Sequence, residues 1–232
     1  METIAKIRST LSVGTPRSGT YSMMKLWKKF GIESHHERAR AHRIGYEFED
    51  SWYDLKKPPQ HLVDVLRRWN NGKMHPDKPY FEADCGKCMM IKLIEEAVPW
   101  FDFFVLIREP LRMANAWKHW RDVNNHRGYH PDDFLDIWIT WGSWLCYQIT
   151  KMKKKPVFLR LEDYILGKYN EFLLDWYGIE KSHENLVIVN DHLKIEIHGA
   201  GPYELMPVNR ERLRLCKQIN IALERLCAKP DA

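Results

Sequence analysis

The residues best suited to chemistry lie around Gly14 and Gly19, two glycines placed five positions apart. Beside them stand three side chains that attract anions, Arg17, Ser18 and Thr20. Where such a loop leads from a strand into a helix, successive backbone N–H groups converge on an anion at the positive end of the helix dipole. The spacing therefore predicts a loop that binds phosphate, in preference to an ordinary strand-to-helix turn.

This loop differs from the phosphate loop of nucleoside triphosphatases. Their motif, G-x-x-x-x-G-K-[ST], supplies a lysine to the β- and γ-phosphates and a hydroxyl group to magnesium. In this chain the two residues after Gly19 are Thr20 and Tyr21, so the lysine and the magnesium ligand are both missing. The sequence thus predicts phosphate binding without magnesium-assisted transfer of a γ-phosphate, and no metal ion is expected.

Arg108 is a second candidate for anion binding, because it directly follows the apolar run FDFFVLI at 101–107. A nearly continuous apolar run predicts a buried strand of a parallel sheet. Ligands of open α/β sheets bind outside the carboxyl ends of such strands, where Arg108 would lie. The alternative is an arginine that caps a helix or forms a salt bridge.

The segment His-His-Glu at 35–37 is the best source of a proton acceptor. Histidine and glutamate act as general bases when they lie within reach of the proton and their pKa is close to the working pH. Either Glu37 or His36 could take this role. The structural alternative is that Glu37 pairs with Arg38, Arg40 or Arg43.

The segments that must position these residues are predicted strands that alternate with predicted helices. This alternation is typical of βαβ units and a parallel sheet. The chain has no internal repeat and no Ser/Gly-rich linker, so we expect a single domain over residues 1–232. Strands are predicted at 6–13, 101–107 and 156–164, and helices at 20–30, 58–72, 89–99, from Leu111, from Pro131 and at 208–228.

The composition is that of an ordinary globular protein. The 232 residues are 44% hydrophobic and 29% charged with a net charge of +5, which excludes a disordered or low-complexity chain. Five cysteines, an odd number, favour a reducing compartment over a disulfide framework. The first residues lack the apolar stretch of a signal peptide, so we expect a soluble cytoplasmic protein that binds neither membrane nor nucleic acid.

Three other features call for no chemical role. Cys85 and Cys88 have the spacing of half a zinc site, but no second C-x-x-C pair exists. Glu162 and Asp163 are expected to cap and orient a helix. The stripe of tryptophans at helical spacing is expected to belong to the core: Trp138, Trp141 and Trp144.

Four segments resemble the sulfotransferases that use 3′-phosphoadenosine 5′-phosphosulfate (PAPS) as donor. TPRSGTYSMMKLW at 15–27 resembles their 5′-phosphosulfate loop, and GIESHHE at 31–37 is similar to the G-x-x-x-x-H-E segment of a bacterial and phage-like branch. FFVLIREPLRMANAW at 103–117 resembles the 3′-phosphate motif, here with the letters R-x-P-L-R. LRLEDY at 159–164 resembles a later R-x-E-D segment. The resemblance implies the sulfotransferase fold, with a P-loop NTPase-like central parallel sheet flanked by helices.

The resemblance also implies roles for individual residues. Arg17 would act on the reacting sulfonate and Glu37 would be the base, with His36 as the second candidate. The family has a serine eight residues beyond the arginine of its 3′-phosphate motif; here that position is Ala116, and a regular helix turns the neighbouring Asn115 about 100° away from it. The implied donor-binding residues are Gly14, Thr15, Pro16, Arg17, Ser18, Gly19, Thr20, Tyr21, Arg108 and Asn115.

The implied reaction is transfer of a sulfuryl group from PAPS to a hydroxyl or amine of an unidentified small-molecule or glycan acceptor, by in-line displacement and without a metal ion. Two alternatives stay open. The first is a nucleotide-binding protein of the same fold without turnover, which the departure at Ala116 favours. The second is a kinase with a degenerate phosphate loop, which the missing lysine disfavours.

Overall fold

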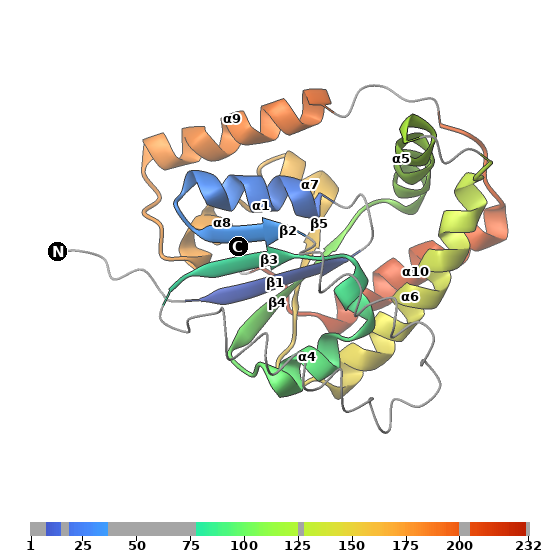
Figure 1. The fold of residues 1–232 in the computed structure, drawn as a ribbon, viewed down its shortest axis with the longest axis horizontal. Helices are drawn as coiled ribbons and strands as arrows, with labels where there is room; N and C mark the ends of the chain where they lie inside the picture. Colours follow the sequence, from blue (N-terminus) through green and yellow to red (C-terminus); the bar gives the residue numbers. More distant parts are fainter. Residues whose placement is uncertain (1–7, 15–18, 37–77, 125–127, 200–204, 231–232) are drawn as a thin grey trace.

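The computed structural model describes residues 8–14, 19–36, 78–124, 128–199 and 205–230. Within these ranges, five parallel strands form one sheet in the order β2-β3-β1-β4-β5 (Figure 1). The strands are β1 (Ser9–Gly14), β2 (Glu33–His36), β3 (Tyr80–Ala83), β4 (Phe101–Ile107) and β5 (Val157–Arg160). The predicted fold class, a parallel sheet flanked by helices, is confirmed.

Helices connect the strands and cover the sheet. They are α1 (Thr20–Lys29), the short 3-10 helix η2 (Gly86–Met89), α4 (Ile91–Ala97), α5 (Pro110–Val123), α6 (Pro131–Lys151), α7 (Leu161–Ile165), α8 (Asn170–Trp176), α9 (His183–Gly199) and α10 (Arg210–Leu226). Two of them, α5 and α6, begin with proline at the first helical position, where the missing N–H is not needed. His130 and Asp133 close a capping box at the start of α6.

Strand β4 is buried on both faces, as its apolar run predicts. Every residue of it except Asp102 is buried. Because side chains alternate along a strand, Phe103 and Val105 enter one apolar core while Phe104 and Leu106 enter another. The sheet is thus covered by helices on both faces, and β4, which ends directly before Arg108, is packed against helices on each face.

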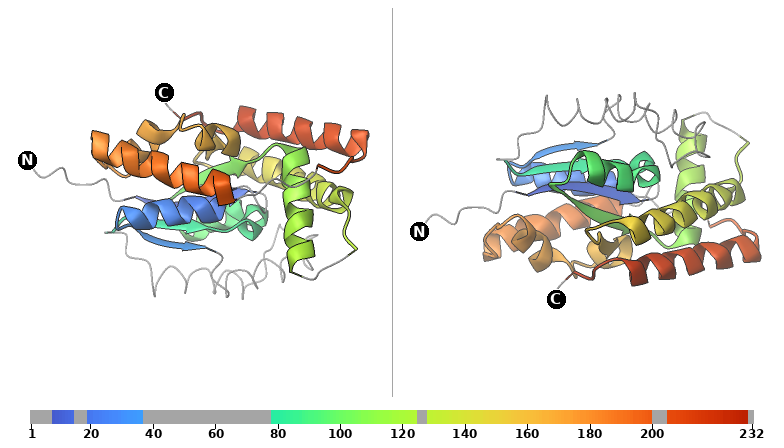
Figure 2. Two further views of the ribbon diagram at one scale, coloured as in Figure 1. Left: turned by 90° about the horizontal axis from the view of Figure 1, so that it is seen from above. Right: turned by 90° about the horizontal axis from the view of Figure 1, so that it is seen from below.

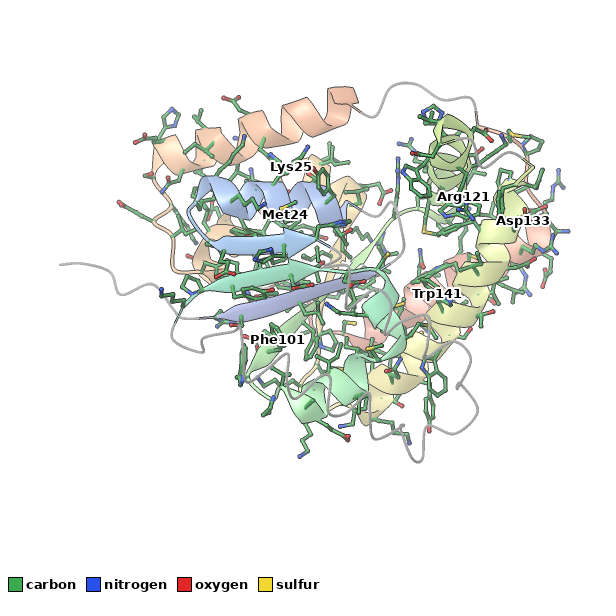
Figure 3. All side chains as sticks on the ribbon, viewed as in Figure 1. Met24, Lys25, Phe101, Arg121, Asp133 and Trp141 are labelled. Atoms are coloured by element: carbon green, nitrogen blue, oxygen red, sulfur yellow. The ribbon has the colours of Figure 1, made fainter. Side chains whose placement is uncertain are left out.

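The first core lies between the sheet and helices α4, α6 and α10, and the second lies between the sheet and helices α1 and α8. Figure 3 labels Phe101 in the first core and Met24 in the second. The tryptophan stripe of α6 belongs to the first core, as expected: Trp138 is fully buried, and Trp141 and Trp144 pack against that core.

Helix α9 lies over α1, on the side away from the sheet (Figure 1). Its buried His192 places Nε2 at 2.9 Å from the carbonyl oxygen of Ser22 and 3.1 Å from the Ser22 hydroxyl. On the other side, α6 and α10 run alongside each other (Figure 2). The chain after α10 returns to the sheet, because the N–H of Phe158 in β5 donates to the carbonyl of Ala228 at 2.9 Å.

Several sequence-based boundaries change. The helix expected at 58–72 lies outside the described residues. The strand expected at 156–164 ends at Arg160, because Leu161 already begins α7. In the described part of the chain, no helix is long and apolar enough to cross a membrane.

Candidate functional site

The two predicted anion-binding segments meet at the carboxyl edge of the sheet. Strands β1 and β4 are neighbours, and their register pairs Gly14 with Leu106, so Arg108 follows two residues beyond the partner of the first loop glycine. The chain also crosses over β1 in passing from β3 to β4, which is where open α/β sheets bind ligands. Of the predicted residues, those at 15–18, including Arg17, and Glu37 lie outside the described residues.

Gly19 closes the loop and begins α1. Its φ of 92° lies in the left-handed region, which side chains other than glycine rarely adopt. A Cβ atom added here would lie 2.4 Å from Cδ1 of Leu161, the first residue of α7. Glycine is therefore favoured at this position both by the backbone conformation and by the packing of the neighbouring helix.

Thr20 and Tyr21 form the first turn of α1 and contact His36 at the end of β2. The buried Thr20 hydroxyl lies 3.2 Å from Nε2 of His36, a hydrogen bond between side chains. Tyr21, half exposed, meets the His36 ring edge to face at 5.2 Å, and Lys25 lies over the Tyr21 ring at 4.6 Å. The structure thus brings one predicted base candidate to the helix N-terminus where the phosphate loop ends.

The backbone that carries Arg108 is fixed by two side chains from other elements. The carbonyl oxygen of Arg108 accepts a hydrogen bond from Nδ2 of Asn220 in α10 at 3.3 Å. The next N–H, that of Glu109, donates to Oε1 of Glu162 in α7 at 3.0 Å. The Glu109 side chain in turn caps α5 by accepting from the N–H of Arg112 at 2.9 Å. The turn after β4 is therefore held by side chains from α7 and α10.

Asn115, predicted to bind the donor, is buried in α5 and bonds to the backbone of a distant segment. Its Oδ1 accepts from the N–H of Met206 at 2.8 Å, and its Nδ2 donates to the carbonyl of Leu111 at 2.9 Å. The carboxamide thus ties α5 to the chain before α10. Contact of Asn115 with a donor stays a prediction.

A buried polar cluster, which the motifs did not single out, lies at the carboxyl end of β3. The ammonium group of Lys87, only 2% exposed, lies 2.9 Å from Glu82 and 3.4 Å from Asp84, and the Tyr80 hydroxyl donates to Glu82 at 2.5 Å. The backbone N–H of Asp84 donates to the carbonyl oxygen of Ser12, which places Asp84 beside the end of β1. Buried charges are costly and gather at functional sites. The signal in the sequence was the alternation Tyr-x-Glu-x-Asp over residues 80–84.

The cysteines are present as thiols, four of them buried. None of the five cysteines forms a disulfide, and burial raises the pKa of Cys146 to about 11 and that of Cys216 to about 12, so both stay protonated near neutral pH. Cys85 and Cys88 are buried beside the polar cluster. Among the residues that the structure describes, no three His, Cys, Asp or Glu side chains are grouped as metal ligands would be.

Comparison with known proteins identifies the fold. No family model and no curated protein matches the sequence. The sulfotransferase domain from the curacin biosynthetic pathway superimposes with a TM-score of 0.53 at 11% identity, over 91% of this chain and 97% of that one. Mouse sulfotransferase SULT7A1, solved in complex with PAP, superimposes with a TM-score of 0.54 at 10% identity, over 96% of this chain and 83% of that one.

The class that these likenesses define is structural: the chain has the α/β fold of the sulfotransferases, built on a five-stranded parallel sheet. The fold implied by the four sequence segments is thereby confirmed. At identities of 10–11%, the likeness shows the fold alone, and any catalytic activity has to be argued from this chain's own residues.

Proposed function

We propose that this protein transfers a sulfuryl group from PAPS to a hydroxyl or amine of a small-molecule or glycan acceptor. One observation carries the proposal: β1 and β4 are paired so that the loop ending at Gly19 and Thr20 and the arginine Arg108 lie at one edge of the sheet. A donor with phosphate groups at both its 5′ and 3′ positions matches two anion-binding elements on adjacent strands. The complex of SULT7A1 with PAP, adenosine 3′,5′-bisphosphate, supports this choice of nucleotide.

The 5′ end of the donor is assigned to the loop and the start of α1. In this proposal the backbone N–H groups of residues 14–20, apart from Pro16, which has none, and the positive end of the α1 dipole hold the 5′-phosphate, together with Ser18, Thr20 and Tyr21. Arg17 binds the sulfonate and bridging oxygens with its planar guanidinium, which can donate two parallel hydrogen bonds. The 3′-phosphate is assigned to Arg108.

The reaction itself needs positioning and charge stabilisation. An acceptor oxygen or nitrogen forms a bond to sulfur while the bond between sulfur and the phosphate oxygen breaks, and the acceptor proton passes to a base. The negative charge that grows on the leaving phosphate is stabilised by the loop N–H groups and Arg17. Glu37 is the proposed base and His36 the second candidate, since the His36 ring already lies beside Thr20.

A second candidate function is nucleotide binding without turnover. It is favoured by the buried Ala116, which carries no hydroxyl group where the resembling family has a serine. Such a protein would bind adenosine 3′,5′-bisphosphate (PAP) and yield no sulfated product from PAPS with any acceptor.

The proposed function is tested by calorimetric titration with PAP, with ADP plus magnesium as the comparison ligand. We expect magnesium-independent binding of PAP that is weakened by Arg108→Ala and unaffected by Arg225→Ala, a change of an exposed arginine in the last turn of α10. Equal affinity for ADP, or an Arg108→Ala protein that binds PAP like wild type, would refute the 3′-phosphate assignment. Transfer from ³⁵S-labelled PAPS to panels of phenols, amines and oligosaccharides then distinguishes turnover from binding alone.

A further inference from the structure

Helix α7 begins at the point where the two halves of the candidate site approach each other. Strand β5 ends at Arg160 and α7 starts at the next residue, without an intervening loop. Because β5 is parallel to β4, its end lies at the same edge of the sheet, with Arg160 paired to Ile107. The first two residues of α7, Leu161 and Glu162, therefore leave the sheet beside Arg108.

Leu161 contacts the phosphate-loop half. The side chain is buried, and the position of a Cβ on Gly19 would lie only 2.4 Å from its Cδ1 atom. The leucine thus packs against the backbone at the start of α1, in the space that a side chain at Gly19 would need. Any shift of Leu161 relative to the sheet would be transmitted to this turn, because packed interiors yield little.

Glu162 contacts the other half. Its Oε1 accepts the hydrogen bond from the N–H of Glu109 at 3.0 Å, and the peptide group that contains this N–H also contains the carbonyl of Arg108. That carbonyl accepts from Nδ2 of Asn220, whose Oδ1 accepts from the indole N–H of Trp138 at 2.9 Å. Both polar atoms of the peptide between Arg108 and Glu109 are therefore held by side chains from distant elements.

We propose that Leu161 and Glu162 form a positioning brace, which sets the phosphate loop and Arg108 at the separation that one ligand with two phosphates requires. This inference rests on the proposed function. Glu162 acts through Arg108: by fixing the peptide plane, it fixes the direction in which the arginine side chain leaves the backbone. A guanidinium group recognises phosphate through fixed fork geometry, so a change in that direction weakens the contact.

The brace predicts a specific change in the preference for PAP over ADP. Losing the Glu162 carboxylate should affect the contact with the 3′-phosphate and spare the 5′ side. Glu162→Ala is therefore expected to weaken PAP binding about tenfold, the lower range for partners that orient a direct ligand. Binding of ADP, which has no 3′-phosphate, should change less than twofold, so the ratio of the two affinities falls. Glu162→Gln keeps an acceptor oxygen for the Glu109 N–H and should restore most of the affinity for PAP.

The matched control is Asp163→Ala. Asp163 is the neighbouring carboxylate in the same short helix, and its contacts, an ion pair to Lys168 at 2.6 Å and a hydrogen bond from Tyr169, stay within residues 163–169. It should change thermal stability without changing the ratio of PAP to ADP affinity. A general loosening of α7 would alter that ratio equally in both variants.

A double-mutant cycle decides between the possible outcomes. If Glu162 acts through Arg108, Glu162→Ala has no further effect on PAP affinity once Arg108→Ala is present. If the two losses multiply instead, or if Glu162→Ala binds PAP like wild type while Arg108→Ala does not, the brace is refuted and the proposed function stands. If Arg108→Ala itself leaves PAP binding unchanged, the 3′-phosphate assignment fails and the brace fails with it. Melting temperatures of all variants confirm that each one folds.

Discussion

Replacing Gly19 by alanine imposes two separate costs on the fold. The first comes from the backbone: a φ of 92° is in the left-handed region, where a Cβ costs about 1–2 kcal/mol. The second comes from packing, because the new Cβ would lie 2.4 Å from Cδ1 of Leu161 and one of the two must move. Forced overpacking of this kind costs about 1–3 kcal/mol.

The free energy of unfolding of Gly19→Ala should therefore fall by about 2–5 kcal/mol, which lowers the melting temperature of a chain of this size by about 4–20 °C. Gly31→Ala separates the two costs. Gly31 follows the other end of α1 with a φ of 72°, but nothing lies within 4 Å of its Cβ position. It should lose only the backbone contribution of about 1–2 kcal/mol.

The measurement is chemical denaturation of both variants and of wild type, together with titration by PAP. We expect Gly19→Ala to be the less stable variant and to bind PAP more weakly, because relief of the contact displaces either the loop or α7. Equal losses of stability in the two variants would show that the contact with Leu161 carries no energy. The reasoning for the brace would then lose its phosphate-loop half.

Three further results are expected. Burial acts to raise the pKa of Glu95, but hydrogen bonds from the backbone N–H groups of Lys154 and Lys153 and from the Lys92 ammonium outweigh it, so the pKa is lowered. Glu95→Gln should therefore lower the free energy of unfolding, measured by urea denaturation at pH 7, by about 1–3 kcal/mol. The pKa of Glu95 in the folded protein lies below its unfolded value of 4.5, so the stabilisation by the ionised carboxylate is complete above pH 4.5 and is lost as the pH falls through the folded value. The difference in unfolding free energy between wild type and Glu95→Gln should therefore vanish in acid. A difference that persists in acid would contradict the assignment. His36→Phe keeps the ring against Tyr21 but loses the bond to Thr20, so PAP affinity should drop about two- to tenfold, and unchanged affinity would dismiss that bond as a positioning contact. Glu37→Gln should lower kcat about 10²- to 10⁴-fold with PAP affinity intact in single-turnover assays, and equal loss of both would exclude it as the base.

The sequence predicts the elements whose signals are local. The apolar run of β4 coincides with residues 101–107, and α1 begins at Thr20 after its glycine and ends before Gly31. The helix at Pro131 starts where proline and the capping residues indicate. In each case the pattern lies within the element or directly beside it, so neighbouring residues alone determine it.

The elements that sequence reasoning missed depend on partners far along the chain. Strand β2, with the sequence ESHH, lies at the edge of the sheet and is held by backbone pairing to β3, so its side chains show no apolar alternation. Strand β3, YFEA, buries Glu82 among strand residues, and the ammonium group of Lys87, five positions later, compensates that charge. The polar alternation Tyr-x-Glu-x-Asp over residues 80–84 is a local signal, but it does not by itself distinguish a buried strand from a polar loop.

The same limit applies within the candidate site. The loop at 14–20 and Arg108 can be recognised from residue types and from the resemblance to sulfotransferases. The bond from Glu109 to Glu162 joins residues 53 positions apart, and the bond from Asn220 to Arg108 spans 112. Contacts of this kind arise from the packing of α7 and α10 on the sheet, and motifs do not encode them.

The departure at Ala116 gives these distant contacts their significance. A hydroxyl group is missing at that position in α5, and the adjacent carboxamide of Asn115 is engaged by the backbone of Met206. In the proposed function, recognition of the 3′-phosphate therefore depends more heavily on Arg108 than it would with a second side-chain ligand beside it. A single arginine is selective only if its backbone is rigid, because rotation of the supporting peptide would let the guanidinium reach other positions. The hydrogen bond that Glu162 accepts from Glu109 and the one that Asn220 donates to Arg108 supply that rigidity, so their removal should cost this chain more affinity than the loss of an ordinary surface contact.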